Sequence, residues 1–159
     1  AEDRLIPDIL RAFEASKPVI IRNPNATRPW QHVLEPLSGY LSLAEQLFKN
    51  PGDFSGGWNF GPYDRDVRPV DWILDQMTTL WPGASWRLDQ DDNPHEATLL
   101  KLDISKASAM LGWAPTWDLN VTLGKIVRWH KCWIEGSDMR VECINEIKEF
   151  TKDMKHAIN

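Results

Sequence analysis

Apolar residues near the start of the chain recur at helical spacing and then give way to a short continuous apolar run. Between positions 6 and 13 they recur every three or four residues, which predicts an amphipathic helix ending before Pro18. Val19, Ile20 and Ile21 follow as an unbroken apolar run that fits an interior strand, and residues 23–25 (NPN) favour a turn. The sequence therefore predicts a helix, a buried strand and a turn.

A second helical pattern begins at Val33, after a loop that carries Arg22, Arg28 and Trp30. Its apolar residues share one stripe of a long helix. They are Val33, Leu34, Leu37, Leu41, Ala44, Leu47 and Phe48. The order of strand, basic loop and helix start indicates a site for a phosphorylated ligand, because a helix start offers unpaired amides to an anion.

The rest of the chain alternates helical patterns with short apolar runs. We expect a turn at 50–53, a short buried strand at 57–60, a helix from Pro69 to 82–83, strands at 86–88 and 99–102, a helix capped by Ser105 and ending at Gly112, a helix capped by Asp118, and a last helix over 139–155. No internal repeat is present. The order predicts a mixed α/β fold.

Length and charge narrow the function classes. A chain of 159 residues with 42% hydrophobic content fits one domain, residues 1–159, with a real core. The net charge of -5 argues against nucleic acid or an acidic membrane as a partner. Neither a membrane span nor a secretion signal is apparent, so the cytoplasm is the expected compartment. Cys132 and Cys143 lack a paired spacing and are expected to be reduced.

Nine tryptophans are spread along the chain, and most of them are expected to serve packing. Those on helical stripes, which should pack between helices, are Trp72, Trp81, Trp129 and Trp133. Trp30 alone lies in the proposed anion site.

The chemistry of Arg28 suits a diphosphate, because a guanidinium can fork onto two phosphate oxygens. The alternative is a surface ion pair with a carboxylate. Other kinds of site find little support. The four histidines at 32, 95, 130 and 156 show no metal-ligand spacing, so no metal is expected, and no strained G-x-S-x-G turn carries a nucleophile.

Three separated segments together resemble one enzyme family. They are residues 28–36 (RPWQHVLEP), residues 58–62 (WNFGP), and a set running from His95-Glu96 through 100–103 (LKLD) and 105–107 (SKA) to 111–113 (LGW) and Pro115. From about Arg4 to about Met139 the chain resembles the NAD-dependent nucleotide-sugar dehydratases and epimerases of the extended short-chain dehydrogenase/reductase class. Pro29 and Glu35-Pro36 depart from many relatives and resemble the subgroup that acts on CDP-glucose.

The resemblance implies that this chain is the C-terminal, substrate-binding portion of a longer enzyme. The family's Gly-rich dinucleotide turn and Tyr-x-x-x-Lys pair are absent, since Tyr40 is followed at the fourth position by Ala44, and Tyr63 by Val67. We therefore expect NAD and every catalytic residue to belong to a missing N-terminal half. The resemblance implies a parent enzyme that converts CDP-glucose to CDP-4-keto-6-deoxyglucose, and a fragment that is inactive alone.

The resemblance also implies which residues bind the CDP-sugar. Arg28 matches the family's phosphate-binding arginine. Asn59 matches a residue near the diphosphate or nucleoside, although its amide could instead cap the following loop. His95 matches a histidine near the ribose or phosphate, although a loop histidine is more often an exposed residue without a role.

Four further candidates rest on weaker likeness. Arg4 and Leu5 resemble a segment that approaches the sugar and nucleoside, and Ile20 and Arg22 lie where the family holds its base. Leu5 and Ile20 could instead be core residues, which for Ile20 is the favoured interpretation, with its backbone kept as a base contact. Arg22 could pair with Glu35 or Asp66.

Three other functions stay open at this point: a fragment of another nucleotide-sugar epimerase or dehydratase, a stand-alone nucleotide-sugar binding module, and a structural helical fragment without a ligand. Because the chain would lack the sheet on which it packs, we expect exposed apolar surface or self-association as a homo-oligomer.

Overall fold

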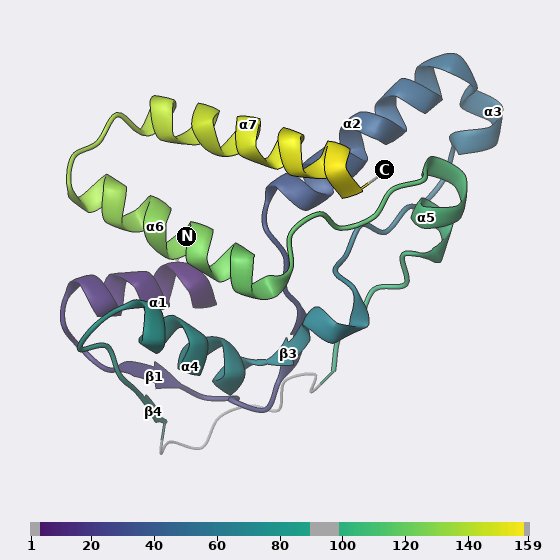
Figure 1. Cartoon of the computed structure of the whole chain (residues 1–159). Coiled ribbons are helices and arrows are strands. Elements are labelled where there is room, and N and C mark those ends of the chain that lie inside the picture. The colour runs from purple at the N-terminus through teal and green to yellow at the C-terminus, as the bar shows by residue number, and fades with distance from the viewer. Residues whose placement is uncertain (1–3, 90–98, 158–159) are drawn as a thin grey trace.

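The computed structural model describes residues 4–89 and 99–157 (Figure 1). Its helices are α1 (Leu5–Glu14), α2 (Leu34–Lys49), α3 (Pro51–Phe54), α4 (Val70–Leu80), α5 (Ser105–Leu111), α6 (Leu119–Ile134) and α7 (Met139–Ala157), with a 3-10 turn η1 (Asp64–Asp66). Its strands are β1 (Val19–Ile21), β2 (Thr27–Pro29), β3 (Val67–Pro69) and β4 (Trp86–Leu88). The mixture of helices and short strands agrees with the predicted α/β class.

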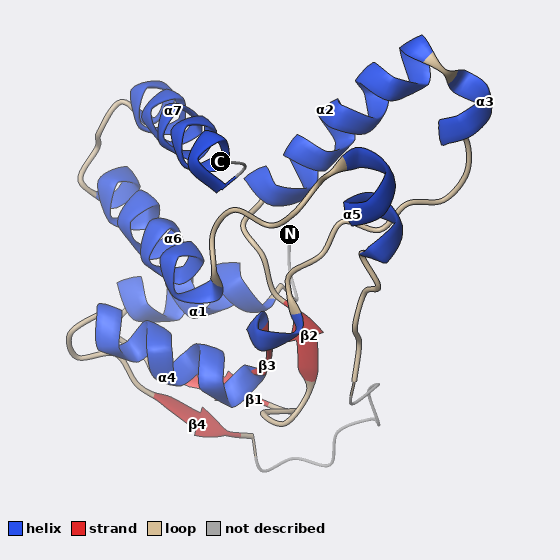
Figure 2. Ribbon diagram, turned by 45° about the vertical axis from the view of Figure 1, so that its right-hand side comes forward, coloured by secondary structure: helices blue, strands red, loops and turns tan. Residues whose placement is uncertain are grey.

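The strands form two separate pairs (Figure 2). β1 lies parallel to β4, with Val19 opposite Trp86, and β2 lies antiparallel to β3, with Arg28 opposite Arg68. The strand predicted at 19–21 is confirmed, with Val19 and Ile21 buried, but within the described residues it has one neighbouring strand and is not interior to a sheet. The basic loop of the sequence analysis also contains strand β2, which was not predicted.

The main core lies where α1, β1, α4 and α6 meet. Ile9 of α1 and Ile73, Leu74 and Met77 of α4 are fully buried there, together with Leu123 of α6. These residues follow the helical periodicity read from the sequence, and α4 packs directly on α6. The core thus fixes the start of α1 and the end of β1 relative to each other.

A second apolar cluster joins α2, α5 and the segment at 57–60. Phe60 packs edge-on against Trp113, with ring centroids 5.1 Å apart, and against Tyr40. Residues 57–60 form no strand, so that prediction is wrong, because no described strand lies beside them to supply the hydrogen bonds.

Three other local predictions are corrected. The turn expected at 50–53 lies in the short helix α3. The strand expected at 99–102 amounts to one bridge between Thr27 and Leu99. Ser105 is the first residue of α5 and not its cap, because Asp103 accepts a hydrogen bond from the Ser105 backbone amide. Two predicted helix ends are confirmed. Gly112, in a left-handed conformation, ends α5, and Asp118 begins α6 by accepting a hydrogen bond from the Val121 backbone amide.

The apolar stripe predicted on α2 points largely to solvent. Leu37, Leu41 and Phe48 are exposed, Phe48 by 91%. The buried residues of α2 are Glu35 and Gly39. The helix turns its carboxylate inward because Glu35 accepts hydrogen bonds from the backbone amides of Thr116 and Trp117, at 2.9 and 2.8 Å.

Helix α7 runs beside α6 and reaches the first turns of α2 (Figure 1). Phe150 is buried against Trp117, with ring centroids 4.9 Å apart. The other apolar residues of its predicted stripe, Val141, Ile144 and Ile147, are exposed, as is Trp133 of α6, which was expected to pack between helices. No described helix is both long and apolar enough to cross a membrane.

Candidate functional site

A cavity of about 500 Å³ opens where the start of α1 meets the ends of β1 and β2. Five of the seven site residues predicted from the sequence line it. They are Arg4, Leu5, Ile20, Arg22 and Arg28. Trp30 also lines this cavity, so the basic segment does form one concave surface together with α1.

Local structure explains why these side chains meet. Arg4 has extended backbone dihedral angles directly before α1, and Arg22 directly follows the last residue of β1. Arg28 is the central residue of β2, and its Nη1 donates to the Thr27 carbonyl at 3.0 Å. Trp30 is held by a hydrogen bond from its Nε1 to the Arg68 carbonyl at 2.8 Å. Arg4 and Arg22 therefore lie at the ends of elements that belong to the core, and Arg28 lies in a strand that β3 holds by pairing.

Charge in the cavity is mainly positive. Arg4, Arg22 and Arg28 supply three guanidinium groups, and Asp8 is the one carboxylate among the described lining residues. Arg22 lies 3.8 Å from Asp89 through its Nε, so the predicted alternative partners, Glu35 and Asp66, were wrong. The surplus of cations suits an anionic ligand such as a phosphate.

Ile20 and Leu5 contribute apolar surface to this cavity. The Ile20 side chain is 53% exposed, so its interpretation as a core residue is wrong; in the strand pair its neighbours Val19 and Ile21 face the core instead. Leu5 is half-buried, packing against the core while it lines the cavity.

Asn59 is not among the described residues that line this cavity. Nδ2 of Asn59 donates to the Asp103 carbonyl at 3.3 Å, a contact that ties its loop to the start of α5. The amide therefore does not cap the loop that follows Asn59, which was the alternative considered in the sequence analysis. His95 lies outside the described residues.

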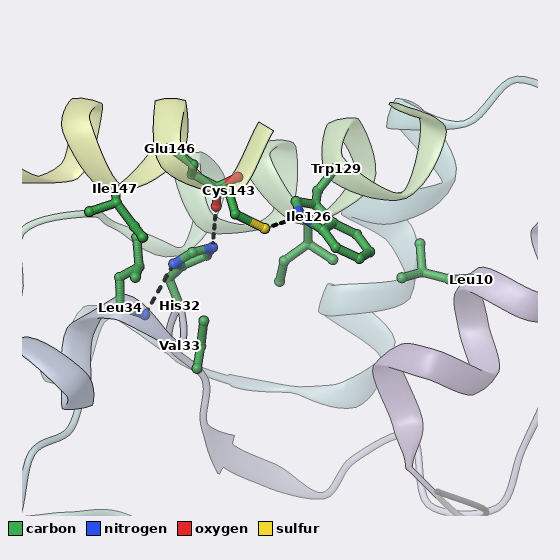
Figure 3. A pocket seen from close by; sticks show the side chains of 9 residues that line it. All are labelled: Leu10, His32, Val33, Leu34, Ile126, Trp129, Cys143, Glu146 and Ile147. Atoms are coloured by element: carbon green, nitrogen blue, oxygen red, sulfur yellow. Dashed lines mark hydrogen bonds and ion pairs between the residues drawn. The ribbon is translucent and has the colours of Figure 1, made fainter. Parts of the chain in front are cut away.

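A second cavity of about 330 Å³ lies between the start of α2, α6 and α7 (Figure 3). Most of its lining is apolar, but His32 and Glu146 contact each other there, with 2.7 Å between Nε2 and Oε1. Nε1 of Trp129 donates to Sγ of Cys143 at 3.3 Å, and Figure 3 shows the thiol turned toward that indole. Sequence reasoning missed this cavity, because its residues come from four distant segments and share no motif.

Comparison with known proteins gives one close relative. The chain is 58% identical over 151 residues to a CDP-glucose 4,6-dehydratase from Salmonella typhimurium, a match that covers 94% of this chain and 42% of the relative. The chain is similar to part of a sugar-nucleotide dehydratase. It spans less than half the length of this curated relative. No family model matches the chain.

Solved structures show the same fold. A UDP-glucuronic acid 4-epimerase from Bacillus cereus, solved with NAD, aligns with a TM-score of 0.67 and 20% identity over 81% of this chain and 40% of its own. A UDP-glucose 4-epimerase from Stenotrophomonas maltophila gives 0.65, with 17% identity over 85% and 41%. A UDP-N-acetylglucosamine 4-epimerase from Bacillus cereus gives 0.61, with 14% identity over 82% and 44%. The chain has the fold of a portion of extended short-chain dehydrogenase/reductase enzymes.

The described residues do not fit the NAD that this fold implies. Glycines that cradle a pyrophosphate open a helix in dinucleotide sites, but Gly56 and Gly57 lead into a loop. Gly39 and Gly61 serve packing, because an added Cβ would lie 2.2 Å from the Phe60 ring and 2.9 Å from Leu102. Nor do residues 4–89 and 99–157 contain a group of three or more His, Cys, Asp or Glu side chains that could hold a metal ion.

Proposed function

We propose that this chain binds the sugar nucleotide in a CDP-glucose 4,6-dehydratase, the enzyme that converts CDP-glucose to CDP-4-keto-6-deoxyglucose. One observation carries the proposal. Five of the seven residues chosen from the sequence for a nucleotide sugar line one cation-rich cavity, in a chain that is 58% identical to part of such a dehydratase.

The chemistry of the cavity supports a diphosphate ligand. Arg28 can fork onto two phosphate oxygens, and Arg22 adds a second guanidinium from the neighbouring strand end. Trp30 and Ile20 offer apolar surface to the nucleoside or sugar. Asn59 and His95 stay predicted contacts: Asn59 is not among the described lining residues, and His95 lies outside the described residues.

Catalysis belongs, in this proposal, to the rest of the parent enzyme. The described residues offer no dinucleotide turn, so NAD and the groups that move protons and hydride would be carried elsewhere in the parent, and the chain alone should not turn over CDP-glucose. The described residues would bind and orient the substrate.

Titration calorimetry of the chain with CDP-glucose tests the proposal. Arg28→Ala should weaken binding by about tenfold to a hundredfold, because hydrogen bonds to a charged group contribute about 1.5–3 kcal/mol. Arg140→Ala is the matched control, since Arg140 is exposed at the start of α7 and does not line the cavity. Equal affinities of the two variants, or no binding by the unchanged chain, would contradict the proposal.

A further inference from the structure

One acidic side chain lies in a cavity otherwise suited to anions. Asp8 is the single carboxylate among the described residues that line the cavity of Arg28, and three arginines line the same cavity. A carboxylate and a diphosphate are both negatively charged and repel each other. If the cavity holds a nucleotide sugar, Asp8 therefore belongs to a part of the cavity that meets something other than phosphate.

The position of Asp8 is fixed by α1. It lies in the first turn of the helix, where its backbone amide donates to the Arg4 carbonyl at 3.0 Å. Arg11, one turn further along, contacts Oδ1 of Asp8 and does not itself line the cavity. This ion pair engages one carboxylate oxygen and steadies the side chain, and the carboxylate has a second oxygen with which to accept a hydrogen bond.

Aliphatic side chains that could contact a flat base line the same cavity as Asp8. Leu5 precedes Asp8 by one turn of α1, and the half-exposed side chain of Ile20 lines the cavity from β1. Two aliphatic side chains and one carboxylate acceptor therefore line the cavity together with the guanidinium groups.

Pyrimidine bases differ in what they present to such an acceptor. Cytosine carries a 4-amino group, which donates, whereas uracil and thymine carry a 4-oxo group, which accepts and would be repelled by a carboxylate. Carboxylates are the side chains that accept from the cytosine amine in protein–nucleic acid complexes.

We propose that Asp8 selects cytosine, accepting a hydrogen bond from its 4-amino group and disfavouring the 4-oxo group of uracil and thymine. The inference rests on the proposed function, since it requires the cavity to hold a pyrimidine nucleotide. It assigns base selection to α1 and leaves diphosphate binding to Arg28.

The test is calorimetric titration of the full chain with CDP and UDP, whose bases differ at position 4 and in the proton on the adjacent ring nitrogen. The unchanged chain should prefer CDP by at least about tenfold. Asp8→Asn should bring the two affinities within about threefold of each other, because an amide can accept from the amine or donate to the oxo group. Asp53→Asn, in the first turn of α3 and outside the cavity, should keep the preference.

The ratio of the two affinities separates recognition from stability, because a partly unfolded variant loses both ligands equally. A CDP preference that persists in Asp8→Asn would overturn the inference and leave the proposed function standing. Equal or stronger binding of UDP by the unchanged chain would also overturn it. Absence of binding to either nucleotide would overturn the proposed function, and the inference with it.

Discussion

Nε2 of His32 lies 2.7 Å from Oε1 of Glu146, and both side chains are 7% exposed. The Leu34 backbone amide donates to Nδ1 of His32 at 3.3 Å, so Nε2 is the ring nitrogen that donates a hydrogen bond to the Glu146 carboxylate. This bond joins α7 to the segment between β2 and α2, four residues beyond Arg28 (Figure 3). Helix α7 therefore supports the segment that follows the cation-rich cavity.

Removing the acceptor should destabilise the fold. Glu146→Leu leaves a buried Nε2–H of His32 without a partner, which should lower the free energy of unfolding by about 1–3 kcal/mol, measured by urea denaturation. Glu146→Gln keeps an oxygen acceptor and should lose less. Glu149→Leu, on the same helix, removes an ion pair of the half-exposed Glu149 with Lys125 and is the control. Equal losses at positions 146 and 149 would contradict this role for His32.

Two helical glycines should respond oppositely to alanine. A Cβ on Gly39 would lie 2.2 Å from the Phe60 ring, so Gly39→Ala should overpack the second cluster and cost about 1–3 kcal/mol. Gly124, inside α6, has open space around an added Cβ, and Gly124→Ala should stabilise by about 0.5–1 kcal/mol through helix propensity. Thermal unfolding of both variants checks this. A stable Gly39→Ala variant would show that Phe60 can move aside.

Helical periodicity predicted the helices of this chain well and the strands only in part. Most of the stripes on α1 and α4 is buried as expected, because these helices pack into the main core; Leu80 at the end of α4 is exposed. The pairing of β2 with β3 could not be predicted, since each strand is three residues long and ends in proline.

The orientation of α2 differs from the one that its hydrophobic residues predict, because Glu35 is buried. Hydrophobicity alone favours burial of Leu37 and Leu41, but the Trp117 amide binds Glu35 and brings the opposite face inward. No sequence pattern predicts a hydrogen bond between residues so far apart in the chain.

The candidate site was predicted from family likeness more than from pattern. Arg28 has a local signal, since it lies between a strand and a helix start. Ile20 has no local signal of this kind, because an apolar residue in a predicted strand is equally consistent with a position in the core. Asp8 was not a candidate, as an acidic residue in a first helical turn is ordinary.

The stability of the chain should carry a pH dependence from Glu35. Burial raises the pKa of this carboxyl above its ordinary value of 4.5, more than the bonds from Thr116 and Trp117 lower it. The folded state then holds the proton to higher pH than the unfolded state does. The free energy of unfolding of the unchanged chain, taken relative to that of Glu35→Gln, should fall as pH rises from 4.5 through the pKa of Glu35 in the folded state. Below pH 4.5 the difference between the two free energies should be constant. Denaturation of both proteins across pH measures this; a difference that grows in favour of the unchanged chain as pH rises would contradict it.

The outward face of α2 should make the chain associate with itself. Leu37, Tyr40, Leu41 and Phe48 are exposed on this one helix, and apolar surface of that kind is seldom left in contact with water. We propose that the isolated chain forms oligomers through this face, seen as a concentration-dependent mass by sedimentation equilibrium. Phe48→Lys and Leu41→Lys together should shift the chain toward monomer with little change in unfolding temperature, because neither side chain is buried. The matched control is Ile144→Lys with Val141→Lys, on the exposed face of α7, which should leave the association unchanged. A monomeric unchanged chain, or equal effects of the two double variants, would contradict an interface on α2.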